Sequence, residues 1–272
     1  MRGIHEPDEQ GFIPSIFNYC DRRCERCRFV RQCRVGIIDV DDMDENREAG
    51  DGKVEDYEER LRKVMGMPQG DDENEDDDGE VEKSGFSLDI NEDYEPNPEY
   101  EKEQETMRKS VEAHPLTQLG VEYSDAVSEW MDPREKRLEA KGISLHRGME
   151  LGISAALRTP DALVLNEAFD EMLWFQHMFH IKCQRALLGK LEDREIEYDW
   201  DPLQSDWNGT AKLAIQIVER CITAWSTIAE LMPEEADGMQ GMIPHLRKCE
   251  ALLREEFPDT EKFIRPGFDA HM

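Results

Sequence analysis

Four cysteines close to the start of the chain are the strongest constraint in the sequence. Cys20, Cys24, Cys27 and Cys33 follow the pattern C-x3-C-x2-C-x5-C, and the whole chain has seven cysteines. Four thiolates are the ligand set of closed zinc sites and of iron–sulfur clusters. The first ten residues contain no apolar run of the kind that signal peptides need, so we expect a cytoplasmic protein, where disulfides are rare. The pattern therefore predicts one metal site held by all four side chains.

The spacing favours a [4Fe–4S] cluster over zinc. Structural zinc sites usually draw their ligands from two separated C-x2-C pairs, whereas this segment contains one such pair. Cubane clusters are often wrapped by a single short cysteine-rich run. Arginines interleaved with the cysteines would lower the thiol pKa values and offset the charge of a thiolate-ligated centre. They are Arg22, Arg23, Arg26, Arg28, Arg31 and Arg34. Zinc remains the alternative, and a redox-active thiol cluster without metal is a third.

Part of the cysteine motif resembles known iron–sulfur loops. The last three cysteines, C-x2-C-x5-C, resemble the cluster loop of helix-hairpin-helix DNA glycosylases, although in that family the first cysteine lies six residues earlier and here three residues separate Cys20 from Cys24. This resemblance covers one loop, and it implies the cluster type without the DNA activity. The first three cysteines also match the radical SAM signature, but Cys33 would close the open iron site and no strand–helix repeat follows.

The whole chain is similar to an uncharacterised bacterial protein family, which has an N-terminal four-cysteine motif and a C-terminal helical domain. This resemblance implies that the cysteines and the helices belong together, and it implies no activity. The stretches that carry it are Ile16-Phe17-Asn18-Tyr19-Cys20-Asp21-Arg22 with Cys24-Glu25-Arg26-Cys27, then Gly209-Thr210-Ala211-Lys212, and Arg265-Pro266-Gly267-Phe268-Asp269.

Charge divides the chain into three parts. Residues 39–105 contain 28 Asp and Glu against 7 Lys and Arg. Such a segment cannot bury enough apolar surface to offset its ordering entropy, so we predict a disordered, self-repelling linker. It separates a metal-binding segment, 1–38, from a helical domain, 106–272. The net charge of −30 disfavours binding to nucleic acid or anionic membrane, and no apolar run is long enough to span a bilayer.

Apolar residues recur at helical spacing throughout the third part. Four helices are predicted: one that opens at His114-Pro115, one from Thr159-Pro160 to about Leu191, one from near Asp206 to Met232, and one that starts at Pro244. No convincing period-2 strand is present. We therefore predict an all-α fold, an antiparallel helical bundle of four main helices. Cys183, Cys221 and Cys249 lie on its apolar stripes and are expected to be small core residues.

A second site inside the helices has weaker support. Di-iron bundles need Glu-x-x-His on two helices, and this pattern is absent. His177 and His180 are neighbours on the second helix, but Asp170 lies seven residues from His177, about 10 Å along the axis. Several charges lie within apolar helices, where we expect interhelical ion pairs and, as the functional alternative, an anion pocket between the two long helices. They are Lys182, Arg185, Lys212, Glu219 and Arg220.

The sequence leads to three hypotheses of function. The first is a [4Fe–4S] protein that acts in electron transfer or redox sensing, in which Cys20, Cys24, Cys27 and Cys33 hold the cluster and the arginines tune it or meet an acidic protein partner. The second is an interaction module in which zinc folds the cysteine segment. The third is a metalloenzyme whose active site surrounds His177, with the cluster as electron donor. Whether the protein is an enzyme is left open.

Overall fold

The computed structural model describes residues 7–38, 97–140, 160–193 and 201–269. The chain divides into two compact units, Met1–Gln104 and Glu105–Met272. Regular structure in the described residues consists of helices and short 3-10 turns, without any strand, so the all-α prediction is confirmed for them. Most of the predicted linker, 39–96, lies outside the described residues. The first α-helix that we describe, α3, begins within the part predicted as linker.

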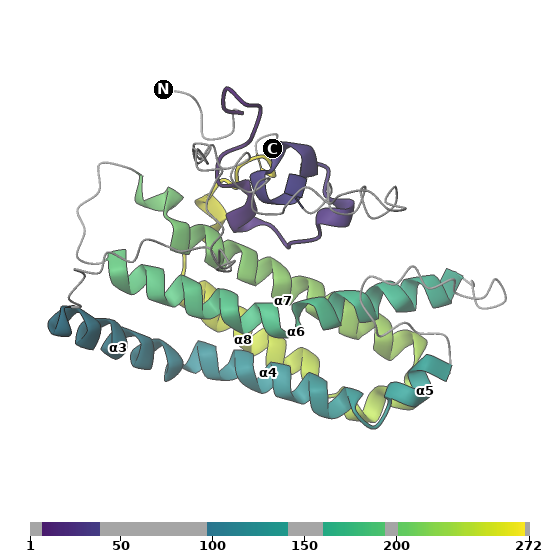
Figure 1. Ribbon diagram of the computed structural model, residues 1–272. Coiled ribbons are helices and arrows are strands. Elements are labelled where there is room, and N and C mark those ends of the chain that lie inside the picture. Colours follow the sequence, from purple (N-terminus) through teal and green to yellow (C-terminus); the bar gives the residue numbers. More distant parts are fainter. Residues whose placement is uncertain (1–6, 39–96, 141–159, 194–200, 270–272) are drawn as a thin grey trace, which may run out of the picture. The chain divides into compact units, whose positions relative to one another are not determined.

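The longer α-helices of the described residues are labelled in Figure 1. Proline stands at the first position of α3, α4 and α6, where its missing N–H costs nothing and its fixed φ suits a helix. The helices are α3 (Pro98–Glu112), α4 (Pro115–Met131), α5 (Glu135–Ala140), α6 (Pro160–Glu192), α7 (Asp206–Leu231) and α8 (Met242–Glu256).

The sequence signals for helix ends agree closely with the observed ends of the long helices. The ring nitrogen Nδ1 of His114 accepts the N–H of Leu116 at 3.2 Å and caps the first turn of α4. Helix α7 ends before Pro233, because proline cannot supply the N–H that a further turn would need. The prediction for α8 was two residues late, since Met242 precedes Pro244 within its first turn.

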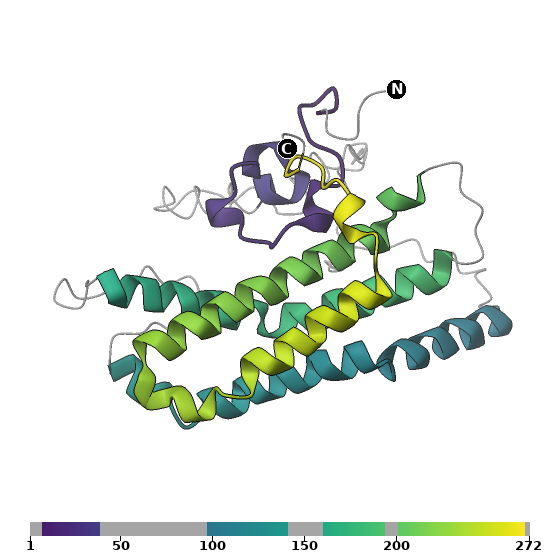
Figure 2. The same cartoon turned by 180° about the vertical axis from the view of Figure 1, so that it is seen from behind.

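Four helices enclose the core of the second unit. Helix α6 packs along α7, α7 packs against α8, and α4 packs against both α6 and α8; the two opposite views in Figures 1 and 2 agree on this arrangement. The predicted stripes are largely buried, and α6 contributes eight buried apolar side chains to the core. These are Ala168, Phe169, Met172, Phe175, Phe179, Cys183, Ala186 and Leu187. Some apolar residues on the other faces of α6 are not buried, and Ile181 is 54% exposed.

A glycine allows α4 and α6 to approach closely. A Cβ added to Gly120 would lie 2.8 Å from Cβ and 3.1 Å from Cα of His180. The second atom belongs to the backbone, so a larger side chain at position 120 would have to separate the two helices. The short contact brings the polar residues of α4 beside the histidines of α6.

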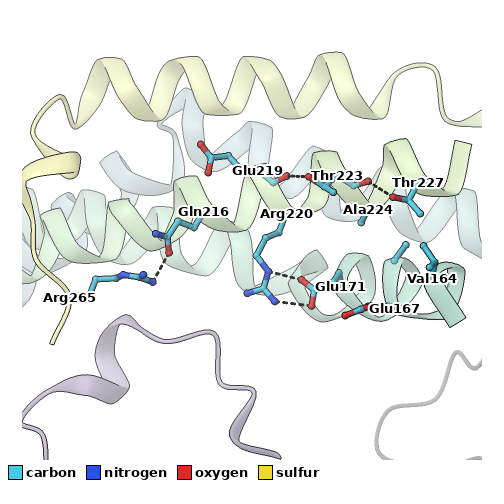
Figure 3. A pocket seen from close by; sticks show the side chains of 11 residues that line it. Val164, Glu167, Glu171, Gln216, Glu219, Arg220, Thr223, Ala224, Thr227 and Arg265 are labelled. Atoms are coloured by element: carbon cyan, nitrogen blue, oxygen red, sulfur yellow. Dashed lines mark hydrogen bonds and ion pairs between the residues drawn. The ribbon is translucent and has the colours of Figure 1, made fainter. Parts of the chain in front are cut away.

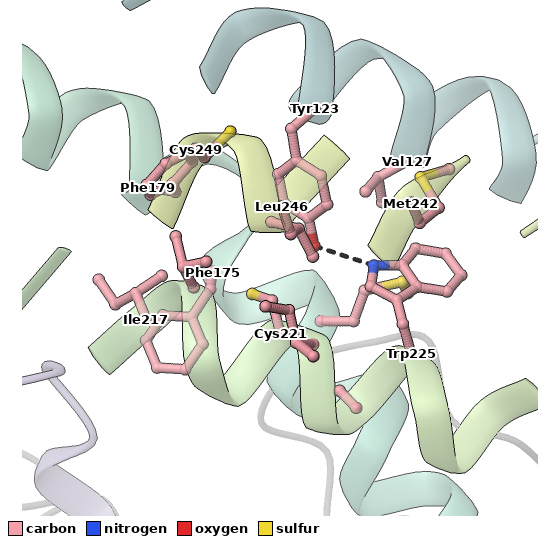
Figure 4. Close-up of a cluster of buried hydrophobic side chains, with 14 of the residues drawn as sticks. Tyr123, Val127, Phe175, Phe179, Ile217, Cys221, Trp225, Met242, Leu246 and Cys249 are labelled. Atoms are coloured by element: carbon pink, nitrogen blue, oxygen red, sulfur yellow. Dashed lines mark hydrogen bonds between the residues drawn. The ribbon is translucent and has the colours of Figure 1, made fainter. Parts of the chain in front are cut away.

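The centre of the core combines aromatic side chains and thiols (Figure 4). The indole N–H of Trp225 donates to the hydroxyl oxygen of Tyr123 at 3.1 Å, which satisfies the buried indole. Cys221 and Cys249 are fully buried, and burial raises the pKa of both thiols to about 12. Together with Cys183 they are small core residues, as the sequence predicts.

Candidate functional site

The four N-terminal cysteines border three successive 3-10 turns. The turns are η1 (Ile16–Tyr19), η2 (Cys24–Arg26) and η3 (Val30–Gln32). Cys20 follows the first turn, Cys27 the second and Cys33 the third, while Cys24 opens the second. Each thiol thus stands at one end of a tight turn. Such positions can direct several side chains of a short run toward one centre.

Burial differs among the four thiols. Cys33 is 8% exposed, and its sulfur accepts the N–H of Gly36 at 3.3 Å. The thiol of Cys20 lies 3.5 Å from the carbonyl oxygen of Phe17. Burial raises the pKa of Cys20 despite the N–H and the positive charge of Arg22, and a charge on Cys33 would raise it further. The expected lowering of thiol pKa by arginine is therefore outweighed at Cys20 by desolvation.

The described part of the cysteine segment, residues 7–38, has a very small apolar core. The buried apolar side chains of these residues besides Cys33 are Ile13, Ile16, Tyr19 and Ile38. Domains below about 40 residues usually need disulfides, a metal or a partner to be stable. All four cysteines of the segment are free thiols, so no disulfide supplies that cross-link.

The donor set fits a thiolate-bound metal centre in kind and in number. Four cysteines lie within one short segment, and at least one sulfur receives a backbone N–H, an interaction that tunes metal-bound thiolates. Across the parts of the chain that the structure describes, no three His, Cys, Asp or Glu side chains gather closely enough to hold a metal ion. The described thiols are thus arranged along the turns and are not assembled around a single point.

The arginines of this segment fall into two groups. Arg34 donates to Asp8 at 2.6 Å and lies over the ring of Phe12, and Arg23 is 5% exposed, so both belong to the fold of the segment. The other four side chains are exposed and give the segment a basic surface in a chain of net charge −30. They are Arg22, Arg26, Arg28 and Arg31.

His177 of α6 joins a polar network at the α4–α6 contact, whereas the buried Nδ1 of His180 has no hydrogen-bond partner. The ring nitrogen Nδ1 of His177 lies 2.9 Å from the hydroxyl of Ser124. Burial, and then the nearby His177, lower the pKa of His180, against the opposite influence of Asp125. The two imidazole rings are 6.4 Å apart. Since no third metal-binding side chain joins them among the described residues, no observation supports the metalloenzyme hypothesis centred on His177.

The embedded charges form ion pairs between elements, as one reading of the sequence predicts. Both oxygens of Glu171 on α6 accept from Arg220 on α7, at 2.6 and 2.8 Å. Arg185 pairs with Asp206 at the other end of the same two helices. Lys182 is 9% exposed and therefore lies largely within the protein.

An open groove of about 560 Å³ lies beside the Arg220–Glu171 pair (Figure 3). Arg265 reaches it from the C-terminal segment and donates to Gln216 at 2.6 Å. Glu167 and Glu219 also line the groove, so its carboxylates outnumber its guanidinium groups. This balance disfavours the predicted anion pocket between the two long helices.

Two of the sequence stretches named above meet in a buried ion-pair network. Lys212 of α7 donates to Asp269 at 2.9 Å and to the carbonyl of Phe263 at 2.7 Å, and Arg265 donates to both oxygens of Asp269. Burial alone would raise the pKa of Asp269, but the hydrogen bonds from Arg265 and Lys212 hold it well below its usual value. The network fastens the C-terminal segment to α7. Pairing across so many residues has no signal in local sequence patterns.

Comparisons with known proteins identify no relative of this chain. A scan against protein-family models finds no match, and neither a search of curated proteins nor one of solved structures finds any. No helix of the described residues is long and apolar enough to cross a membrane. The function is therefore inferred from the residues and their geometry.

Proposed function

We propose that this chain is a metal-binding protein whose N-terminal segment carries a [4Fe–4S] cluster and serves in electron transfer or redox sensing. Cys20, Cys24, Cys27 and Cys33 would be the ligands. The observation that carries the proposal is the pairing of four free thiols with a core too small to hold the segment together. A bound metal centre would supply the missing cross-link, since metal binding and folding are coupled in small metal-stabilised domains.

A bound cluster would supply one-electron chemistry, and the chain's own residues would tune it. The N–H of Gly36 donates to the sulfur of Cys33, and hydrogen bonds to cluster sulfurs influence the reduction potential. Exposed arginines such as Arg22 and Arg28 offset negative charge near the thiolates and could meet an acidic protein partner. The helical unit, which we interpret as the predicted antiparallel bundle, would serve as a scaffold. We also infer a cytoplasmic location, where free thiols persist.

Zinc is the second candidate, because the same small core calls for a cross-link whichever metal supplies it. Four thiolates also suit a closed tetrahedral zinc site. In that case the segment would be an interaction module and would have no redox function. The two candidates differ in colour, in inorganic sulfide and in metal content.

Anaerobic purification followed by visible absorption and by iron, sulfide and zinc analysis tests the proposal. We expect brown protein with about four irons and four sulfides per chain. A Cys24→Ser variant should lose most of this metal. The matched control is Cys249→Ala, which removes a thiol from the core of the helical unit and should leave the metal content unchanged. Colourless protein with one zinc would replace the cluster by the zinc module, and protein without either metal would overturn both.

A further inference from the structure

A pocket in the helical unit contains a buried hydrogen-bond donor that has no acceptor. The pocket, of about 460 Å³, lies between the C-terminal half of α4 and the start of α8. Trp130 lines it and is 3% exposed, yet its indole Nε1 finds no hydrogen-bond partner. A buried donor without an acceptor destabilises the folded state, so such a group calls for an explanation. Two other indole N–H groups have protein acceptors: Trp207 donates to Asp193 and Trp225 donates to Tyr123.

A second donor converges on the same place. The guanidinium of Arg134 donates from Nε to Glu235 and from Nη1 to the carbonyl of Trp130, both at 2.7 Å. Its third nitrogen, Nη2, faces Gly238. A Cβ added to Gly238 would lie 2.8 Å from Arg134 Nη2 and 2.9 Å from Trp130 Nε1. The two nitrogens therefore lie close to one point beside Gly238, near enough for one carboxylate to contact both, and a side chain at position 238 would collide with them.

The charge of the pocket suits one negative group. Arg134 and Arg137 both pair with Glu235, which is 4% exposed, so two positive charges share a single carboxylate. The pocket also includes Gly241, the N-cap of α8, where no side chain caps the first turn. The N–H of Met242 already donates to the carbonyl of Met239 at 3.0 Å and Pro244 has no N–H, so the first turn of α8 contributes little more than its partial positive charge.

The rest of the lining limits the kind of ligand. Ala126 and Met242 offer apolar surface, while His245 uses its Nε2 to donate to the carbonyl of Leu119 at 2.7 Å. The exposed carboxylate of Glu129 lines the rim and would repel a second negative charge. A ligand with one carboxylate and a neutral or cationic remainder fits these groups better than a dianion or phosphate.

We propose that this pocket binds a small monocarboxylate, of which a free amino acid is one example, through Trp130 Nε1 and Arg134 Nη2. The carboxylate would satisfy the indole donor and the excess positive charge together. This site lies wholly within the helical unit and does not depend on the metal proposed for the cysteine segment.

Nuclear magnetic resonance of the indole N–H groups in the full chain tests the site directly. L-leucine and butyrate are the probes, and succinate and inorganic phosphate are the comparisons. We expect both monocarboxylates to shift the Trp130 resonance with dissociation constants of about a millimolar or tighter, as small ligands allow. The resonances of Trp207 and Trp225 are internal controls and should not move, because both donors already have acceptors.

Two variants separate binding at this pocket from binding elsewhere. Gly241 lines the pocket and has an ordinary helical φ of −81°, and a Cβ added there would meet nothing within 4 Å, so Gly241→Leu adds a bulky side chain to the pocket lining without straining the backbone. It should abolish the shift of Trp130. Trp130→Phe keeps a ring in the core but removes the donor, and calorimetry should show binding weakened about tenfold or more.

Each result decides the proposal. A shift of Trp130 that saturates and is lost in Gly241→Leu supports it. The absence of any shift with leucine and butyrate overturns it, and so does a shift that persists in Gly241→Leu. A stronger response to phosphate or succinate than to the monocarboxylates would overturn the ligand class. Circular dichroism of both variants shows whether the helical unit stays folded. Titration of the unmodified chain decides, without any variant, whether the monocarboxylates shift the Trp130 resonance.

Discussion

The cysteine segment and the helical unit are stabilised in different ways. Four apolar side chains besides Cys33 are buried in the former, whereas four long helices of the latter enclose a continuous core of aromatic, aliphatic and thiol side chains. Burial of apolar area contributes roughly 25 cal/mol per Å², so the helical unit can offset its conformational entropy by packing alone. Residues 7–38 bury too few apolar side chains for this. Thiols serve as packing groups in the helical unit, and we propose that they bind the cross-linking metal in the cysteine segment.

Removal of the four N-terminal thiols should have the largest effect and should act on one region only. In the variant with Cys20, Cys24, Cys27 and Cys33 all changed to Ser, we expect the segment to unfold, because metal binding contributes about 10–16 kcal/mol to small metal-stabilised domains. Hydrogen exchange measures this at the amides of Ile13 and Ile37, which donate to backbone carbonyls within the segment.

Helices α6 and α7 of the same molecules provide the control, since their amides should keep full protection. Unchanged exchange at Ile13 and Ile37 in the serine variant would show that the small core is sufficient without a metal. Loss of protection throughout α7 would instead show that the two regions do not differ in the way described here.

A matched pair of leucine substitutions on α6 tests whether packing holds the helical unit. Leu187 is 5% exposed and Leu163 is 51% exposed. We expect Leu187→Ala to lower the free energy of unfolding by about 2–5 kcal/mol, because it leaves a cavity in the core. Leu163→Ala should change it by about 0.5 kcal/mol or less. Urea unfolding followed by circular dichroism gives both values, and equal effects would contradict the assigned core.

The smallest effect should come from the ion-pair network of the C-terminal segment. The pKa of Asp269 lies below its usual 3.8 in the folded protein, so the unfolded chain takes up a proton first as the pH falls. Its contribution is therefore complete above about pH 5 and is lost with acidification through the folded pKa. Asp269→Asn should cost about 1–3 kcal/mol at neutral pH and reduce the loss of stability below pH 4.

Thermal unfolding at several pH values measures this effect. Asp206→Asn is the control, because Asp206 forms an exposed ion pair with Arg185 and should contribute about 1 kcal/mol or less. If Asp269→Asn leaves both the neutral stability and its acid dependence unchanged, the network does not fasten the C-terminal segment.

Helical spacing carried most of the information about the second unit. The stripes of α4, α6 and α7 are buried as predicted, and proline marked the start of α4 and the end of α7. Helix α3 was not predicted, because acidic residues dominate its sequence. Acidic residues in the first turn stabilise a helix, so a high negative charge does not by itself exclude one. The sequence predicted that ion pairs such as Arg220–Glu171 would form between helices, but it did not predict which residues would pair. Spacing along one helix does not determine which residue of another helix lies opposite.

The sequence by itself determined the types of residue available: four thiols in a short basic run, a strongly acidic part, and helices that carry apolar stripes. These follow from composition and local periodicity, which act within a few turns of chain. Tertiary structure alone decided that Lys212 meets Asp269 and that Trp130 and Arg134 face Gly238. Such contacts join residues from different helices and turns, and their geometry depends on how whole elements pack, which no local pattern encodes.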